Sequence, residues 1–123
     1  FDPHLAANLG ELLKQVAPPG IKVNVVSIDK AIRVYNNPKY EQETVFLLFI
    51  CPQDIVRMVE GGVPITSVNI GGMAFREGKQ QITKAVSVDD DDRAAFRSLH
   101  ERGIELEIRP VATDSKVDIM PKL

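Results

Sequence analysis

The chain has 123 residues, which suits one domain with one core and is too short for two. It is 44% hydrophobic and 26% charged, and its formal net charge of −2 argues against a nucleic-acid binder that works by neutralising phosphates. No apolar run approaches the roughly 20 residues of a membrane-spanning helix, and the sequence has no signal-peptide pattern at its start. The single cysteine excludes an internal disulfide, so we expect a cytoplasmic protein.

The first elements in chain order are a helix and a strand. Residues 2–16 predict a helix, because Asp2 can cap it, Pro3 suits its first position and leucines follow at helical spacing. The Pro-Pro-Gly run at 18–20 ends that helix. Residues 21–28 are rich in β-branched side chains and predict a strand near a sheet edge.

The middle of the chain predicts two helices with a buried strand between them. Residues 29–35 predict a short helix that Asp29 caps. Residues 44–50 are apolar without alternation, which is typical of an inner strand of a parallel sheet with helices on both faces. Pro52 then opens a helix that the glycine pair 61–62 ends.

The last part of the chain predicts three strands and one helix. Residues 66–70 and 84–88 are short strands, and a helix runs from Asp89 to Gly103. In residues 104–108 isoleucine and leucine alternate with glutamate, so this strand should keep one face in water. Residues 112–123 carry little pattern.

Strand and helix therefore alternate about five times, with connections too long for hairpins. The fold class this predicts is α/β: a three-layer, open, mostly parallel sheet with helices on both faces.

A candidate binding site follows the predicted strand 66–70, where ligands gather in such sheets. Two glycines allow the backbone N–H groups to approach an anion, and two cations nearby suit a phosphoryl group or an acidic partner. Two apolar residues beside this polar loop are typical of a docking surface. The alternative is a tight turn with solvated basic residues. The predicted phosphate- or partner-binding residues are Gly71, Gly72, Met73, Phe75, Arg76 and Lys79.

Cys51 and Arg57 have the Cys-x5-Arg spacing of a phosphate-binding loop with a cysteine nucleophile, at a strand-to-helix junction. The residues between them oppose that interpretation. Pro52 supplies no N–H group, and Asp54 would bring a negative charge to an anion site. A buried, inert thiol is the favoured interpretation.

The acidic and histidine residues give no catalytic or metal pattern. Four consecutive aspartates, 89–92, point in different directions on a helix and cannot converge on one ion, whereas acids at a helix start complement its dipole. His100 is expected on a helix surface, and His4 has no visible partner. We therefore predict no metal site and no cofactor.

Five strings in the sequence together resemble one family. They are Gln15–Gly20, Ile32–Tyr40, Val59–Val63, Ser67–Arg76 and Arg102–Glu107. Over about residues 12–114 the chain is similar to the enzyme IIB component of the mannose/sorbose class of bacterial sugar phosphotransferase systems, with the mannose-specific branch nearest. The string Gly-Gly-Met-Ala-Phe-Arg is its most specific part.

The resemblance implies a transferase. Enzyme IIB of this class accepts a phosphoryl group from a phosphohistidine of enzyme IIA and passes it to a mannose-type sugar held by the membrane enzymes IIC and IID. The implied location is the cytoplasm, at the inner-membrane permease, with no nucleic-acid partner; a homo-oligomer is left open. The glycine loop would then flank the phosphohistidine site.

The family's acceptor histidine lies in a motif of the form Asp-Asp-Arg-Leu-Ile-His-Gly-Gln-Val, which this sequence lacks. Neither His4 nor His100 has those neighbours. We therefore expect the family's first strand and its phosphohistidine upstream of Phe1, so that residues 1–123 form a single enzyme IIB-like domain that is incomplete at its N-terminus.

Two other functions stay open at this point. One is a non-catalytic regulatory or binding module of the same fold, which has lost the histidine. The other is a cysteine-dependent phosphatase built on Cys51 and Arg57.

Overall fold

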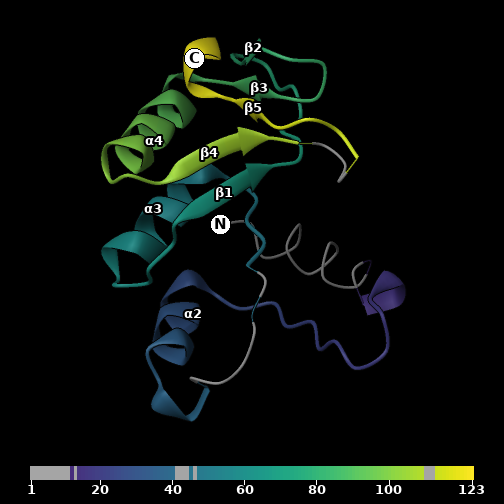
Figure 1. Cartoon of the computed structure of the whole chain (residues 1–123), viewed down its shortest axis with the longest axis vertical. Helices are drawn as coiled ribbons and strands as arrows, with labels where there is room; N and C mark the ends of the chain where they lie inside the picture. The colour runs from purple at the N-terminus through teal and green to yellow at the C-terminus, as the bar shows by residue number, and fades with distance from the viewer. Residues whose placement is uncertain (1–11, 13, 41–44, 46, 110–112) are drawn as a thin grey trace. The chain divides into compact units, whose positions relative to one another are not determined.

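The computed structural model describes residues 12, 14–40, 45, 47–109 and 113–123 (Figure 1). The chain divides into two compact units, residues 1–50 and 51–123, each of which is described by itself below. Within the described residues, no helix is both long enough and apolar enough to span a bilayer.

The first unit contains helix α2, Ile28–Tyr35, and the short 3-10 helix η1, Pro38–Tyr40. The cap of α2 is Ser27 rather than the predicted Asp29, and its side chain accepts the N–H of Lys30 at 3.2 Å. Asp29 lies in the first turn, where its charge complements the helix dipole. Residues 12 and 14–16 are helical, as predicted, and the rest of the helix predicted over 2–16 lies outside the described residues.

The two strands predicted for this unit, 21–28 and 44–50, are wrong wherever the structure describes them. Residues 21–27, 45 and 47–50 belong to no strand, and 44 and 46 lie outside the described residues. Apolar, β-branched composition suggested strands, but a strand is stable only when a neighbouring strand satisfies its N–H and C=O groups. Leu48 is 73% exposed and Val25 is 44% exposed, so these side chains lack the burial that the predicted strands required.

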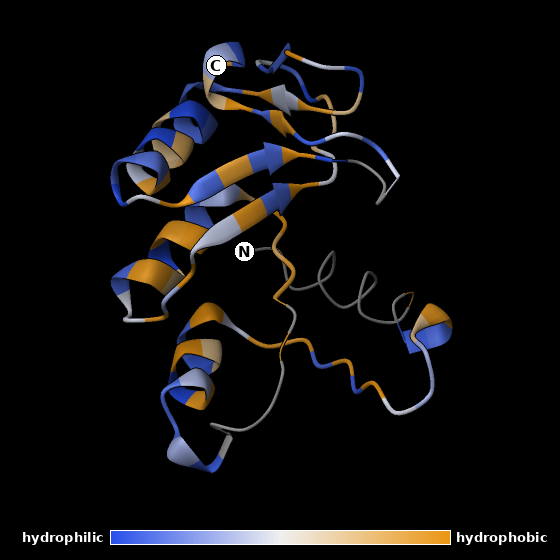
Figure 2. Ribbon diagram, in the orientation of Figure 1, coloured by the Kyte–Doolittle hydropathy of each residue, from blue (hydrophilic) through white to orange (hydrophobic). Residues whose placement is uncertain are grey.

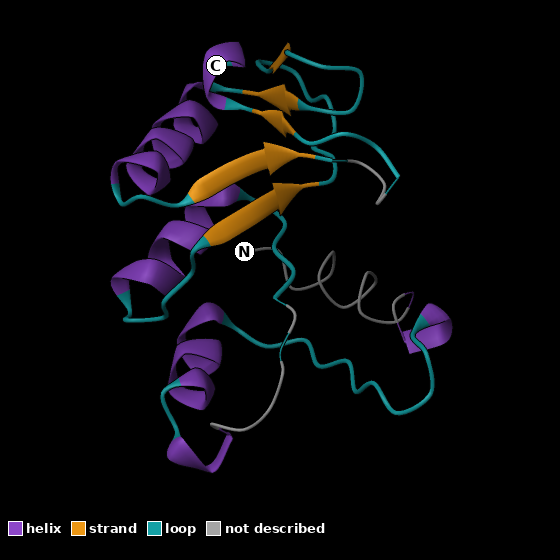
Figure 3. Cartoon of the chain, in the orientation of Figure 1, coloured by secondary structure: helices purple, strands orange, loops and turns teal. Residues whose placement is uncertain are grey.

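The second unit contains a three-stranded mixed sheet in the order β1-β4-β5 (Figure 3). Strands β1, Ser67–Ile70, and β4, Glu105–Ile108, are parallel, with Ile70 opposite Ile108. The short β5, Val117–Asp118, pairs antiparallel with β4. Two further short strands, β2, Gln80–Gln81, and β3, Ser87–Val88, form a separate antiparallel pair. The predicted strands 66–70 and 104–108 are confirmed, and that at 84–88 is reduced to its last two residues.

Two helices accompany this sheet, both close to their predicted ranges. Helix α3 spans Pro52–Glu60, and Gly62 follows it with a φ of 95° that favours glycine. Helix α4 spans Asp90–Glu101 and is capped by Asp89. The chain leaves α4 at Gly103, which has a φ of 81°.

The core of this unit lies between the helices and one face of the sheet. Helices α3 and α4 pack against each other and lie on the same side of β1 and β4 (Figure 1). Hydrophobic and hydrophilic residues alternate along these two strands (Figure 2), and in β4 Leu106 and Ile108 are buried while Glu105 is exposed. The predicted wet face of this strand is therefore confirmed, as is the α/β class. The largest fully buried side chains are Phe96, Met58, Leu99, Ile119, Val63, Val86 and Val88.

Two phenylalanines provide a matched test of this core. Phe96 in α4 is 1% exposed and Phe75 is 67% exposed. Replacing Phe96 by alanine should lower the free energy of unfolding by about 3–5 kcal/mol, because it leaves a cavity. Phe75→Ala should cost less than about 1 kcal/mol, since an exposed ring buries little surface. Urea unfolding measures both values, and equal losses would contradict this placement of the core.

Candidate functional site

The loop that follows β1 leaves the sheet at the carboxyl end of that strand and is fixed there by backbone hydrogen bonds. The N–H of Met73 donates to the C=O of Ala85 at 2.9 Å, and the N–H of Ser87 donates to the C=O of Met73 at 2.9 Å. These bonds form a parallel bridge between Met73 and Val86. The backbone of the predicted site therefore has a defined position against residues 85–87.

Neither Gly71 nor Gly72 is needed for the local backbone. Their φ angles are not positive, unlike those of Gly62, Gly78 and Gly103. A Cβ atom at Gly71 would meet no described atom within 4 Å, and one at Gly72 would make an ordinary 3.5 Å contact with the carbonyl oxygen of Ala85. The two exposed glycines therefore leave open space beside the loop, where another group has access to the backbone.

The next residues of the loop face solvent. Phe75 is 67% exposed and Arg76 is exposed. The N–H of Lys79 donates to the C=O of Arg76 at 3.0 Å, which closes a turn with Gly78 at its third position. Gly78 has a φ of 90°, a positive value that glycine adopts at little steric cost at the third position of a turn. The structure thus holds the apolar and basic side chains of residues 75 and 76 on one short, exposed segment.

Lys79 differs from the other predicted residues because its side chain has an internal partner. Its ammonium donates to Oδ2 of Asp92 at 2.9 Å. The Lys79 side chain is 17% exposed and that of Asp92 is 4% exposed. Lys79 therefore forms an ion pair that no sequence pattern predicted, and Arg76 is the exposed cation of the loop.

Asp92 is the centre of a small buried network. Its Oδ1 accepts from the side-chain amide of Gln53 at 3.0 Å, and its Oδ2 accepts from Lys79 and from the N–H of Asp89 at 3.2 Å. In return, the N–H of Asp92 donates to Oδ1 of Asp89 at 2.8 Å, which completes a capping box at the start of α4. One carboxylate therefore joins the first turn of α3, the first turn of α4 and the end of the loop.

The charge of Asp92 is stabilised by this network. Burial alone would raise the pKa of Asp92, but hydrogen bonds from Gln53, Lys79 and Asp89, together with the positive charge of Lys79, lower its pKa below the ordinary value. The carboxylate is therefore ionised at neutral pH. Sequence reasoning placed Asp92 among acids that complement a helix dipole; an aspartate three residues after a capping Asp89 was the available signal for a capping box.

A further cation lies at the same edge of the sheet. The N–H of Arg109, directly after β4, donates to the C=O of Ile70 at 3.3 Å, and the side chain of Asn69 donates to the C=O of Arg109 at 3.1 Å. The Arg109 guanidinium lies 3.8 Å from Glu107, and its buried Nε has no hydrogen-bond partner among the described residues. The sequence analysis did not single out Arg109, which follows the predicted strand 104–108, whereas the parallel pairing brings it beside the start of the glycine loop.

Cys51 and Arg57 do not form an anion site. Burial raises the pKa of the Cys51 thiol, and the negative charge of Asp54 also raises it, against a hydrogen bond with the Asp54 backbone that lowers it. Arg57 lies 3.9 Å from the Asp54 carboxylate. A protonated thiol beside a carboxylate is a poor nucleophile for a phosphate ester, so the geometry opposes the phosphatase alternative.

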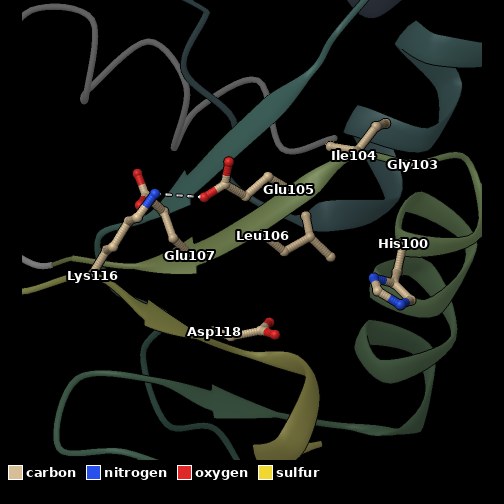
Figure 4. A pocket seen from close by; sticks show the side chains of 8 residues that line it. All are labelled: His100, Gly103, Ile104, Glu105, Leu106, Glu107, Lys116 and Asp118. Atoms are coloured by element: carbon tan, nitrogen blue, oxygen red, sulfur yellow. Dashed lines mark hydrogen bonds and ion pairs between the residues drawn. The ribbon is translucent and has the colours of Figure 1, made fainter.

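A cavity of about 500 Å³ lies along β4 and β5, and three of the eight residues that line it are acidic (Figure 4). Glu105, Glu107 and Asp118 line it, and Lys116 pairs with Glu105 at 2.9 Å. His100, on α4, lies away from that ion pair and is exposed. Three carboxylates repel a phosphoryl group, so this cavity is not a phosphate site. His4 lies outside the described residues, and these residues contain no cluster of three or more potential metal ligands.

Comparisons with known proteins agree with one another. Residues 7–123 match the family model of the PTS system sorbose subfamily IIB component. The chain is 58% identical over 112 residues to the sorbose-specific EIIB component of Lacticaseibacillus casei, covering 91% of this chain and 68% of the relative. It is 62% identical over 109 residues to the mannose-specific EIIAB component of Escherichia coli (strain K12), covering 89% of this chain and 34% of the relative.

A solved structure of a IIB domain is also similar to this chain. The crystal structure of the IIBSor domain of the sorbose permease from Klebsiella pneumoniae superposes with a TM-score of 0.91 at 53% sequence identity. The match covers 98% of this chain and 74% of that chain. The compared proteins are therefore longer than this chain of 123 residues, and the match spans only about a third of the EIIAB component.

The Asp92 network makes a prediction about stability and pH. Replacing Asp92 by asparagine should lower the free energy of unfolding at pH 7 by roughly 2–4 kcal/mol, because Lys79 loses a buried partner. A lowered folded-state pKa means that this stabilisation is present above the unfolded pKa of about 3.9 and is lost as pH falls through the lower folded value. The difference from the wild type should therefore be constant above about pH 5 and shrink below about pH 4.

The matched control for this prediction is Asp90→Asn. The side chain of Asp90 is 99% exposed although it pairs with Arg93 at 2.9 Å, so its loss should cost less than about 1 kcal/mol. Urea unfolding from pH 3 to pH 8 measures both variants. A similar loss in the two variants, or a difference that does not depend on pH below 4, would contradict the network.

Proposed function

We propose a phosphocarrier function for this chain, which belongs to the sorbose subfamily of IIB components of the sugar phosphotransferase system. IIB components of this system act as sugar phosphotransferases. In the proposed reaction, the protein takes a phosphoryl group from a phosphohistidine of enzyme IIA and passes it to a mannose-type sugar during uptake. Enzymes IIC and IID hold that sugar in the membrane, and the IIB protein works on the cytoplasmic side of this permease.

The residue that carries the phosphoryl group is proposed to be a histidine upstream of Phe1. Among the described residues, the one histidine is His100, an exposed residue of α4 beside a cavity that three carboxylates line. These carboxylates disfavour a phosphohistidine at His100, because the negative phosphoryl group needs cations and N–H donors around it. His4 lacks the neighbours of the family's acceptor motif, so the acceptor loop is proposed to lie upstream of Phe1.

The observation that carries the proposal is the loop at the carboxyl end of β1. Its backbone is held at Met73, two glycines leave open space before that point, and Phe75 and Arg76 are exposed after it. In-line transfer between two histidines requires positioning and charge stabilisation more than covalent help from the protein. A fixed loop with accessible backbone and an exposed cation suits that role.

The predicted residues divide into three roles in this proposal. The backbone of Gly71 and Gly72 approaches the acceptor loop or the phosphoryl group. Met73 and Phe75 contact the apolar rim of enzyme IIA, and Arg76 stabilises phosphate or an acidic patch of the partner. Lys79 would need to leave Asp92 to reach a phosphoryl group, so its contribution to binding is indirect.

Mapping the phosphorylated residue tests the proposal directly. The full-length gene product, incubated with phosphorylated enzyme IIA, should gain acid-labile, base-stable phosphate on a histidine upstream of Phe1, and Cys51→Ser should gain the same amount. The transfer reaction needs no thiol, which is the physical reason to expect no effect. Phosphate on Cys51 would overturn the proposal, and no phosphorylation at all would favour the regulatory module.

Arg76 gives a second test. Arg76→Ala should slow phosphoryl uptake from enzyme IIA roughly 10- to 100-fold, the effect of losing one charge-assisted contact in a transition state. Arg97→Ala on α4 is the matched control, because Arg97 is equally an exposed arginine but lies on a helix surface. Rapid-quench kinetics would measure both rates. Unchanged uptake in Arg76→Ala, or equal slowing in the control, would remove Arg76 from the site.

A further inference from the structure

We infer that Asp92 is a positioning residue for phosphoryl transfer: through its ion pair with Lys79 it holds loop 73–79 in the conformation that receives the phosphodonor. The inference rests on the proposed function, because it concerns the loop that the proposal places at the donor interface. In this inference the ion pair of Lys79 and Asp92 orients Phe75 and Arg76 and does not contact the phosphoryl group.

The loop has one anchor at each end. At Met73 the anchor is the pair of backbone hydrogen bonds to Ala85 and Ser87, each 2.9 Å long. At Lys79 it is the 2.9 Å bond from the ammonium to Asp92. Between the anchors, Phe75 and Arg76 make no side-chain hydrogen bond or ion pair with another described residue. Their orientation therefore depends on the two ends of the loop.

The Asp92 end of the second anchor is rigid. Asp92 lies in the first turn of α4, and the reciprocal bonds with Asp89, 2.8 and 3.2 Å, fix its backbone and its carboxylate together. Gln53 in the first turn of α3 holds the other oxygen at 3.0 Å. A carboxylate held on both oxygens in a 4% exposed position presents a fixed acceptor to Lys79.

The side-chain anchor can be removed while the hydrogen bonds at the start of α4 are kept, although the buried Asp92 carboxylate then loses its cation. In a Lys79→Met variant the capping box between Asp89 and Asp92 remains, and so does the bond from Gln53. The turn closed by the N–H of Lys79 and the C=O of Arg76 loses only its side-chain attachment. Residues 75–78 would then sample more conformations, and binding of the donor would have to order them again.

This effect has a kinetic signature that separates positioning from direct contact. Ordering a loose loop weakens the encounter with the donor, so the KM for phosphorylated enzyme IIA should rise roughly 3- to 30-fold while kcat changes less than about twofold. A Lys79 that touched the phosphoryl group would lower kcat as well. It would also keep its contact in Asp92→Asn, where its ammonium is released from the buried pair.

The experiment uses the full-length protein with phosphorylated enzyme IIA as donor. We expect K79M and D92N to raise KM by similar factors, the double variant to be no worse than either alone, and K79R to restore most of the affinity. K116M is the matched control, since Lys116 makes an ion pair of the same 2.9 Å length with Glu105 of β4 and not with Asp92. Its KM should not change.

Thermal unfolding and hydrogen exchange complete the test. A wild-type KM in D92N, with only a lower Tm, would reduce Asp92 to a structural residue and overturn the inference. Additive effects of K79M and D92N would also overturn it. Amide exchange at residues 75–78 should accelerate in K79M and not in K116M. If the wild type takes no phosphoryl group, the proposed function fails, and unchanged exchange in K79M would show separately that the anchor does not exist.

Discussion

The structure of the second unit depends on one buried carboxylate. Asp92 has both of its oxygens engaged, by Gln53 on one side and by Lys79 and the Asp89 N–H on the other. A charge at this depth is destabilising unless such partners compensate its loss of water, so the partners must keep their places for the fold to be stable. Two helix starts and the end of the candidate loop are thereby held in one arrangement.

The two glycines of the loop differ in backbone conformation from the other glycines named above. Gly62, Gly78 and Gly103 have positive φ angles, so each meets a requirement of the backbone itself. Gly71 and Gly72 have no such angle, and the described surroundings would admit a Cβ atom at either position. Their small size leaves the loop backbone accessible, which the proposed close approach by a phosphoryl group or a partner loop would require.

Local signals explain what the sequence could predict. Pro52, the glycines after α3, the capping Asp89 and the alternation along β4 all lie within or next to the elements they predict, and those elements are confirmed. Residues 21–28 and 44–50 have strand-like composition, but a strand needs a partner that composition does not supply. The two-residue β5 is too short to show a period.

At the site, the sequence predicted the glycine loop because two glycines follow a strand. The division of its cations into exposed Arg76 and paired Lys79 could not be predicted, because the Lys79 pair joins residues 13 apart in sequence.

An acidic and a basic side chain lie at opposite ends of β4, an arrangement that suits the proposed transfer between two proteins. Glu105 begins β4 and lines the cavity together with two other carboxylates, while Arg109 follows the end of the same strand and lies beside the start of the glycine loop. In the proposed reaction, the open edge, where Arg76 is also exposed, would attract a phosphoryl group more than the cavity would. In the proposed transfer, an enclosed pocket would exclude a protein donor, because the donor's phosphohistidine would have to reach an acceptor on the surface of another domain. An exposed loop with a fixed backbone suits that proposed docking, and the inferred role of the pair of Lys79 and Asp92 is to hold this loop in place.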